Sequence, residues 1–537
     1  MSEVESTIMR VDSLVAEAER ARGHGNWREA ADRYLQAASL VDRTRAEPLE
    51  ADALQLRAAD CLIHTGALGS AWRILRTLLE QCDVQPPSSP AKALIGTTWR
   101  RGRFMLSRSD IDAEHPPTTK LADRRRRAVL EGAAETLGLV QTALADSLRT
   151  YHLAEVARAG DSSSRCRALA SEVAMQTRIG SPFDKSVKRL LERCGDLAAQ
   201  SGRRRDQASR QLAIATHEFS HGRWRGCVEA CERANAIFLE LADEDISVAH
   251  ERARVSALHW FALAWLGEFA ALRTHLDRVI AQAEADKDSL LLLEALTGQP
   301  MLAWLAADEV DGVRERAAML LRHHQAVQNA PWPESGYRRQ HYRELMAEVH
   351  AGLYRGDPLP AWAALTAQWR ELESAFYLPM RTIGLEIRSA RARVGLALVE
   401  RFVRDPELAA ARMLAQTGMG GWDHSRLVAD VKSQLEVIAR EHNCVAPSLG
   451  HLLQAGLANL EGRHEDAQIQ LDAAVRGFNS VDMALHRECA RYALGELIGG
   501  LEGGQMQDLA EAWMRGAGVV VPRRMAASQA PGFGLGH

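Results

Sequence analysis

The stretch GNWREA (Gly25–Ala30), followed by Tyr34 and Ala37, decides the fold of this 537-residue chain. Counted from the glycine, a large residue stands at position +2, and small or apolar residues stand at +5, +9 and +12. This spacing places the last three on one face of a helix, where they can pack against a neighbouring helix. The pattern returns in the stretches that begin at Gly66, Gly222, Gly267 and Gly462.

Each stretch has the features of the turn and second helix of a tetratricopeptide-type hairpin. The glycine ends the first helix in a left-handed backbone conformation that costs it little, and the +2 residue fills the turn. We therefore expect an all-α fold, a tetratricopeptide-like α-solenoid in which antiparallel helical hairpins form a right-handed superhelix. Chains of this kind offer extended surfaces that bind other molecules.

The composition favours helices and argues against several classes of function. Hydrophobic residues make up 46% of the chain and aromatic residues only 5%, while the net charge is -4. A charge so close to neutral does not favour nucleic acid as a partner of the whole surface. The eight cysteines include no C-x-x-C pair, which indicates reduced thiols. Neither a signal peptide nor a run of roughly 18 apolar residues is visible, so we expect a cytoplasmic protein without a membrane span.

Proline and glycine divide the sequence into four parts. Residues 1–82 predict N-terminal tetratricopeptide-like hairpins. Residues 83–123 form a proline-rich insertion, with a short basic helix expected near Ala91–Leu106. Residues 124–525 predict the main helical-repeat solenoid, and the Gly/Pro-rich residues 526–537 predict a flexible tail.

Three stretches carry a resemblance to a known group of proteins. They are TGQPMLAWLAAD (Thr297–Asp308), GYRRQHYRELMAE (Gly336–Glu348) and AEAWMRGAGVVVPRRMAASQAPGFG (Ala510–Gly534). In these stretches, and along most of its length, the chain resembles the C-terminal helical region of large bacterial multidomain signalling proteins. Those proteins carry a serine/threonine kinase domain, then an ATPase module, then tetratricopeptide-like repeats.

The motifs of the kinase and the ATPase are missing from this sequence. It contains no G-x-G-x-x-G loop with an H-R-D and a D-F-G motif, and no G-x-x-x-x-G-K-[ST] phosphate loop. The resemblance therefore implies the sensing or docking part of such a system, either as a separate gene product or as a piece of a longer parent. It implies a protein partner, namely a kinase or ATPase signalling component, and no catalytic residue or cofactor in this chain.

The stretch HEFSH (His217–His221) matches the H-E-x-x-H motif of zinc proteases, in which two histidines bind the metal and the glutamate is the general base. Together with Cys227 and Cys231, the two histidines could also form a structural zinc site. The repeat pattern argues for a simpler interpretation. It places both cysteines at the +5 and +9 packing positions and directs the histidines towards solvent.

Arginine clusters border the insertion. They could bind an anionic partner, or they could lie on solvated helix faces and pair with the 70 acidic residues of the chain. The anion-binding candidates are Arg100, Arg101, Arg103, Arg124 and Arg125.

One stretch combines aromatic and cationic side chains, the residue types that are enriched at binding hot spots. Ordinary packing between repeats explains such residues equally well. The candidates for a partner or ligand groove are Trp332, Tyr337, Arg338, Arg339, His341, Tyr342 and Arg343.

Taken together, the sequence predicts a non-catalytic regulatory, docking or ligand-sensing protein that offers a concave groove to a protein partner or a small molecule. Two alternatives stay open. One is a metal-dependent hydrolase at the HEFSH motif, and the other is a regulator that binds nucleic acid through the arginine clusters.

Overall fold

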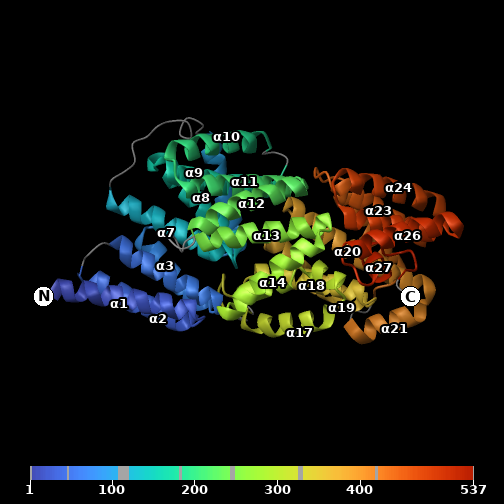
Figure 1. Ribbon diagram of the computed structural model, residues 1–537, viewed down its shortest axis with the longest axis horizontal. Helices are drawn as coiled ribbons and strands as arrows, with labels where there is room; N and C mark the ends of the chain where they lie inside the picture. The colour runs from blue at the N-terminus through green and yellow to red at the C-terminus, as the bar shows by residue number, and fades with distance from the viewer. Residues whose placement is uncertain are drawn as a thin grey trace.

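The structure is a computed structural model that describes residues 3–44, 48–106, 120–180, 184–241, 248–324, 330–417 and 421–535. The chain is all-helical, with 83% helix, and its described residues form 26 α-helices and no strand (Figure 1). Consecutive helices pack in neighbouring pairs, as in an α-solenoid. The all-α class predicted from the sequence is therefore confirmed. Among the described helices, none offers the length of apolar surface that crossing a lipid bilayer requires.

The N-terminal helices form two hairpins, followed by a helix that leaves the line of the repeats. Their bounds are α1 Glu3–Gly23, α2 Trp27–Thr44, α3 Pro48–His64, α4 Leu68–Gln81 and α5 Pro90–Leu106. Helix α5 lies where the sequence predicts the short basic helix of the insertion, and it packs against α8. Helices α3 and α4 pack instead against α7, the next helix of the main array. The second half of the expected insertion, residues 107–119, lies outside the described residues.

The central part of the chain continues the array of hairpins. Its helices are α7 Leu121–Gly138, α8 Thr142–Ala159, α9 Ser162–Ile179, α10 Asp184–Ser201, α11 Arg204–Ser220, α12 Trp224–Leu241, α13 Ala249–Leu266, α14 Phe269–Ala285, α15 Ser289–Leu296, α16 Met301–Ala306 and α17 Val310–Leu321, followed by the 3₁₀ helix η3 Arg322–His324.

The C-terminal part adds ten further helices. They are α18 Arg339–Tyr354, α19 Pro358–Ser374, α20 Arg381–Arg404, α21 Pro406–Thr417, α22 His424–Ile438, α23 Ala446–Leu460, α24 His464–Ser480, α25 Ala484–Ile498, α26 Gly500–Gly516 and α27 Pro522–Gln529.

The repeated sequence pattern has the local role that its spacing predicts. All five pattern glycines have a positive φ between 69° and 80°, in the turn between two helices. At the +5, +9 and +12 positions the side chains are buried, with the single exception of the half-buried Val279. Each second helix therefore presents one apolar face to its neighbours, and burial of these faces is the main source of stability.

Hairpin turns also contact segments that lie far ahead in the sequence. Three hydrogen bonds between such segments are Trp27 Nε1 to the Asp286 carbonyl (2.9 Å, 259 residues apart), Asn443 Nδ2 to the Ser220 carbonyl (3.1 Å, 223 residues apart) and Arg524 to the Asp308 carboxylate (2.9 Å, 216 residues apart). The array therefore folds back on itself, and its early turns pack against later ones.

Most of the pattern glycines are covered by these contacts. A Cβ atom added at Gly222 would lie 2.6 Å from Cγ2 of Val445, and one added at Gly267 would lie 2.9 Å from the ring of Trp513. A Cβ added at Gly462, in the last of the five turns, would meet no atom within 4 Å. The last turn is therefore bare, which means that no distant segment packs against its glycine. The four earlier turns are covered by such segments.

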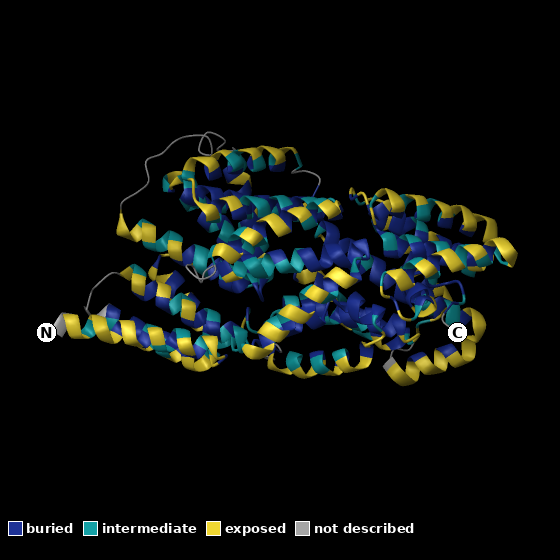
Figure 2. Ribbon diagram, viewed as in Figure 1, coloured by how far each residue is buried: buried dark blue, intermediate teal, exposed yellow. Residues whose placement is uncertain are grey.

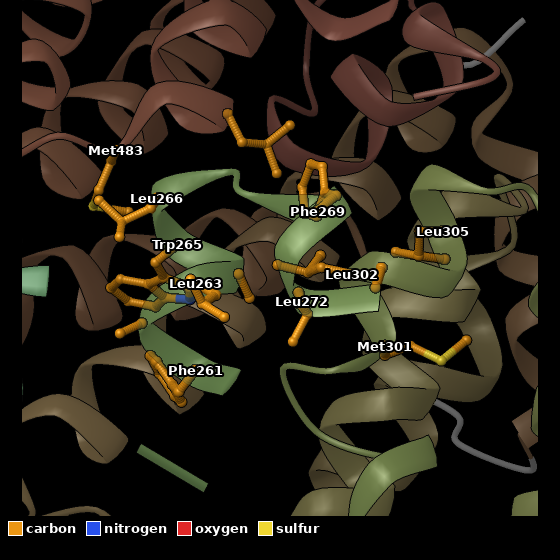
Figure 3. Packing of buried hydrophobic residues seen from close by; sticks show 14 of the residues in the cluster. Phe261, Leu263, Trp265, Leu266, Phe269, Leu272, Met301, Leu302, Leu305 and Met483 are labelled. Carbon is orange, nitrogen blue, oxygen red and sulfur yellow. The ribbon is translucent and has the colours of Figure 1, made fainter. Parts of the chain in front are cut away.

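The largest core cluster joins helices from the middle and the end of the chain (Figure 2). Figure 3 shows Phe261 and Trp265 of α13 beside Phe269 of α14 and Leu302 of α16, with Met483 approaching from the turn before α25. Because this cluster includes residues from α11 to α27, the two halves of the array share one apolar interior.

The residues predicted as a flexible tail, from Ala526 on, pack against the rest of the molecule as far as the structure describes them. Residues 526–529 complete α27, which packs against α18 and α25, and Phe533 and Leu535 are buried. The Asn459 side chain donates a 2.7 Å hydrogen bond to the Gly532 carbonyl. Glycine and proline here permit close packing of backbone against α23, because a Cβ at Gly456 would lie 2.6 Å from the Pro531 oxygen.

Candidate ligand-binding cavity

A cavity of about 240 Å³ lies between helices that are far apart in the sequence. Its walls come from α7, α8, α9, α11, α13, α18 and α20, and from the loops that precede α16 and α20. Its volume is slightly below the range of roughly 300–1,000 Å³ that is typical of ligand pockets. The cavity therefore has room for a small organic molecule.

One wall of the cavity is apolar. Leu212 and Phe219 of α11 lie beside Leu258 and Phe261 of α13, and Met380 approaches from the loop before α20. The rings of Phe219 and Phe261 make an edge-to-face contact with centroids 4.8 Å apart. This wall can accept an apolar body by excluding water from it.

A second wall carries carboxylates that are each paired with an arginine. Arg167 contacts Glu131 at 2.7 Å and Asp206 at 3.3 Å, and Arg254 contacts Glu135 at 3.1 Å. Burial alone would raise the pKa of Glu131, but the Arg167 guanidinium overcomes this effect and lowers the pKa to about 2. Each of these carboxylates therefore has a guanidinium partner within the wall.

The third wall is rich in arginine. Arg149 and Arg178 share the carboxylate of Asp146, at 3.0 and 2.8 Å, and Arg339 lies 3.4 Å from Glu294. Burial raises the pKa of Asp146 and the two guanidinium groups lower it, with a net shift below its usual value. This wall has more arginines than carboxylates.

Arg343 of α18 belongs to the same wall and has a different environment. Its side chain is 8% exposed and donates hydrogen bonds to the carbonyls of Glu294 and Thr297, the latter at 2.9 Å. Burial lowers its pKa, and nearby Glu294 opposes this shift. No ion pair joins this guanidinium to a carboxylate in the described part of the chain, and its Nε atom has no hydrogen-bond partner there.

Behind Arg343 lies a buried carboxyl group that does not itself line the cavity. Glu386 of α20 accepts hydrogen bonds from the Tyr342 hydroxyl and from the Gln299 amide, the latter at 2.7 Å. Burial raises its pKa to about 7, although both hydrogen bonds act in the opposite direction. Tyr342 and Gln299 line the cavity, so Glu386 is hydrogen-bonded to two of its lining side chains.

Three of the seven residues predicted for a groove lie at this cavity. Arg339, Tyr342 and Arg343 stand on consecutive turns of α18, and all three line it. The predicted groove and the cavity therefore share these three residues, and the other lining residues were not among the candidates.

The other four groove candidates serve packing. Trp332 packs against the core of α3, α4, α7 and α8, and the Tyr337 hydroxyl donates to Gln368 at 2.9 Å. Arg338 donates to the His324 carbonyl at 2.9 Å, and the His341 ring accepts a hydrogen bond from the Arg338 backbone at 3.1 Å. These contacts fix the loop that leads into α18.

The HEFSH histidines are engaged with each other and with α20. Their ring centroids are 4.3 Å apart, and His221 binds the His217 carbonyl at 2.8 Å through Nδ1 and Arg381 at 2.9 Å through Nε2. Burial, and then the neighbouring His221 and Arg223, lower the pKa of His217 to about 4. His217 is only 9% exposed, so the expectation that both histidines face solvent is wrong for it, because the α11 turn is covered by α20.

The remaining residues of the proposed zinc sites have other partners. Glu218 forms a two-point ion pair with Arg223 at 2.7 Å, and Cys227 and Cys231 are fully buried in the main core. Within the described ranges, no three histidine, cysteine or acidic side chains are grouped so as to hold a metal ion.

The arginine clusters near the insertion are used largely inside the molecule. Arg101 pairs with the buried Glu172 at 2.7 Å, and Arg125 pairs with Asp52 at 2.5 Å. The other candidates are placed as follows: Arg100 over the Tyr151 ring at 3.7 Å, Arg103 5.8 Å from the Trp99 ring centre, and Arg124 on the exposed side of α7.

Most of the charged cavity residues were missed by sequence reasoning. They are Glu131, Glu135, Arg149, Arg167, Arg178, Glu251 and Arg254. A signal for them exists in the helix register, because Glu131 and Glu135 stand four residues apart among the buried alanine and leucine positions of α7. Charged residues on an apolar helix face indicate an internal polar site.

In comparisons with known proteins, no family model matches this sequence, and no curated protein matches it either.

Proposed function

We propose that the chain is a non-catalytic, ligand-sensing helical-repeat protein that binds a small molecule in the central cavity. Its repeats are of the tetratricopeptide-like type and form a right-handed superhelix. It acts in the cytoplasm with a bacterial kinase or ATPase signalling component as its protein partner.

The cavity is the observation that carries this proposal. Its lining runs from Glu131 of α7 to Ile383 of α20, and it combines an apolar wall with walls of convergent polar and charged groups. This combination is typical of small-molecule sites. A bound molecule would contact hairpins from both halves of the array at once.

The stretches that carry the resemblance to signalling proteins support the same proposal. The Gly298 N–H donates to the Arg343 carbonyl at 2.9 Å, which joins the first stretch to the second beside the cavity. The Val520 N–H donates to the Ala306 carbonyl at 2.8 Å, which joins the third stretch to the first. The three stretches therefore form one continuous body, although they are far apart in the sequence.

The proposed mechanism is a shift between two arrangements of the hairpins. A molecule that contacts α9, α11 and α18 together favours the arrangement in which these helices are closest, and its differential affinity sets the size of the shift. The outer turns of the array would then present a changed surface to the partner protein.

The geometry favours neither of the alternative functions. The glutamate of the HEFSH motif is held in an ion pair with Arg223, away from the role of a general base. Two of the arginine candidates for an anionic partner, Arg101 and Arg125, are already paired with carboxylates.

Mass spectrometry of small molecules that co-purify with the protein tests this proposal. The variant Ala174→Phe narrows the cavity from α9, and Ala270→Phe, on the exposed side of α14, is its matched control. We expect the wild type and the control to release the same small organic molecule on denaturation, and the cavity variant to lack it. Identical extracts from all three proteins would contradict the proposal.

A further inference from the structure

We propose that the cavity ligand is a small organic monoanion, with one acid group paired to Arg343 and an apolar body of about the size of one aromatic ring. This inference rests on the proposed function, and names the chemical class of the molecule that the cavity takes.

The first step is that Arg343 is the unbalanced charge of the cavity. Six arginines line it, and five of them have an ion pair: Arg149, Arg167, Arg178, Arg254 and Arg339. In the described residues, Arg343 makes no such pair, although it is more than nine-tenths buried. Glu294 and Glu386 attract this guanidinium without forming an ion pair with it. A buried charge without a counter-ion in direct contact is costly, and an anion in the cavity would reduce that cost.

The second step is that the guanidinium of Arg343 is held in place. The Glu294 and Thr297 carbonyls fix its Nη2 atom, and the loop that supplies them is tied to the backbone of Arg343 by the Gly298 N–H. The Nε atom is left without a hydrogen-bond partner among the described residues. A guanidinium that is positioned in advance binds an acid group with little loss of side-chain entropy.

The third step concerns the charge of the ligand. Arg339 stands next to Arg343 on the α18 face and has its one ion pair at 3.4 Å, so a single acid group can also interact with it. A second negative charge would approach Glu131, Glu135 and Glu251 on the opposite wall. A positively charged ligand would meet six arginines. One negative charge is therefore the best match.

The fourth step concerns the body of the ligand. An apolar cavity of roughly 150 Å³ holds a benzene molecule, and this cavity of about 240 Å³ has room for one ring with a short acidic substituent. The Phe219 and Phe261 rings supply the apolar surface against which such a body would pack.

Fluorine NMR with three probes of similar size tests this inference on the full chain. The probes are 4-fluorobenzoate, 4-fluorobenzamide and 4-fluorobenzylammonium, and the fluorine line width reports binding. We expect the benzoate to bind about tenfold more tightly than the amide, as a charge-assisted hydrogen bond implies, and the ammonium to bind least. A fourth probe, 4-fluorophenyl phosphate as its dianion, is expected to bind more weakly than the benzoate.

Two arginine variants locate the acid group. Arg343→Met is expected to bring the benzoate-to-amide ratio close to one, while Arg515→Met, at an exposed arginine of α26, leaves the ratio unchanged. Arg343→Lys keeps the charge and is expected to retain part of the preference, and circular dichroism checks that each variant is folded.

The outcomes separate this inference from the proposed function. Binding of the amide or the ammonium as tightly as the benzoate would overturn the anion inference and leave the cavity as a binding site. A benzoate preference that survives Arg343→Met would overturn the assignment to Arg343. If no probe binds the wild type, the ligand-sensing function itself fails. The series on the wild type decides the charge question even where a variant does not fold.

Discussion

The turn at Gly25 and the turn at Gly462 carry the same sequence pattern and have opposite surroundings. Both glycines have a positive φ, 69° and 77° respectively, and both precede a helix with buried +5, +9 and +12 residues. Gly25 is pressed against the turn at Asp286 and Lys287, whereas Gly462 faces open space. The pattern therefore specifies the hairpin, and the position in the array decides whether the turn also serves as a contact between distant repeats.

This difference explains why the molecule has a cavity. A row of hairpins that met only its neighbours would leave its inner surface open. Contacts such as the one between Ser220 and Asn443 bring the two halves of the array together around the space that α7, α11 and α18 enclose.

Replacing each glycine by alanine should show the largest difference between the two turns. A left-handed alanine costs ~1–2 kcal/mol in either variant. In Gly25→Ala the new Cβ would also lie 2.5 Å from the Asp286 carbonyl carbon and 2.8 Å from the Lys287 Cβ, which adds about 1–3 kcal/mol of overpacking. Urea unfolding, with hydrogen exchange of α2 and α14, measures both effects. Equal losses in Gly25→Ala and Gly462→Ala would show that the covered turn bears no stabilising contact.

A carboxyl group in the covered interior should respond to pH in the opposite sense to one at the bare turn. Burial raises the pKa of Glu386 to about 7, above the pKa near 4.5 of the unfolded chain. The protonated carboxyl therefore contributes fully to stability below pH 4.5, and this contribution is lost as the pH rises through 7. At Glu461, beside the bare turn, burial raises the pKa slightly while Arg463 and Lys432 lower it overall.

The variant Glu386→Gln should remove this loss of stability. Between pH 5 and pH 8, we expect the free energy of unfolding of Glu386→Gln to increase by roughly 1–3 kcal/mol relative to that of the wild type. For Glu461→Gln, we expect no such relative increase over the same interval. Urea unfolding at the two pH values provides the measurement. A stability difference between Glu386→Gln and the wild type that does not change with pH would contradict a protonated interior carboxyl.

A smaller effect is expected from the histidines at the two kinds of turn. His64 lies at a covered turn, 2.9 Å from Asp288 and stacked on Trp27 with ring centroids 4.5 Å apart, whereas His464 follows the bare turn and is exposed. Burial would lower the pKa of His64, but Asp288, with help from Asp60, raises it to about 9.

Because its pKa is raised, protonated His64 stabilises the fold fully below pH 6.5, and this contribution is lost as the pH rises through 9. His64→Gln should therefore cost ~1–2 kcal/mol at pH 6.5 and much less at pH 10. His464→Gln, the same substitution at an exposed position, is the matched control. Hydrogen exchange in α3 and α15 at both pH values would reveal the loss, and a cost that stays constant to pH 10 would refute the assigned ion pair.

Local features of the fold could be predicted because their causes are local. The glycine turns, the buried face of each second helix and the helix within the insertion follow from spacing, backbone freedom and proline positions. Contacts between residues more than 200 positions apart have no such signal, so the coverage of Gly25 and Gly222 could not be foreseen. The same holds for the C-terminal tail. Its composition suggests mobility, but its packing depends on contacts with α18, α23 and α25.

The candidate site was predicted in one part only. Arg339, Tyr342 and Arg343 stood out because aromatic and cationic residues are dense in one short stretch. Glu131 and Arg167 stand on different helices, and the spacing of Glu131 and Glu135 on α7 does not indicate a partner on α9. Their pairing at 2.7 Å depends on how α7 and α9 pack, which no single stretch of sequence contains.

A crystal structure of the full chain with 4-bromobenzoate would test most directly the claim that stacked hairpins enclose a site for a small organic anion. The account predicts an anomalous bromine peak against Phe219 and Phe261, with the carboxylate on Arg343. A cavity that contains only water at a saturating probe concentration, or a carboxylate bound away from Arg343, would contradict it.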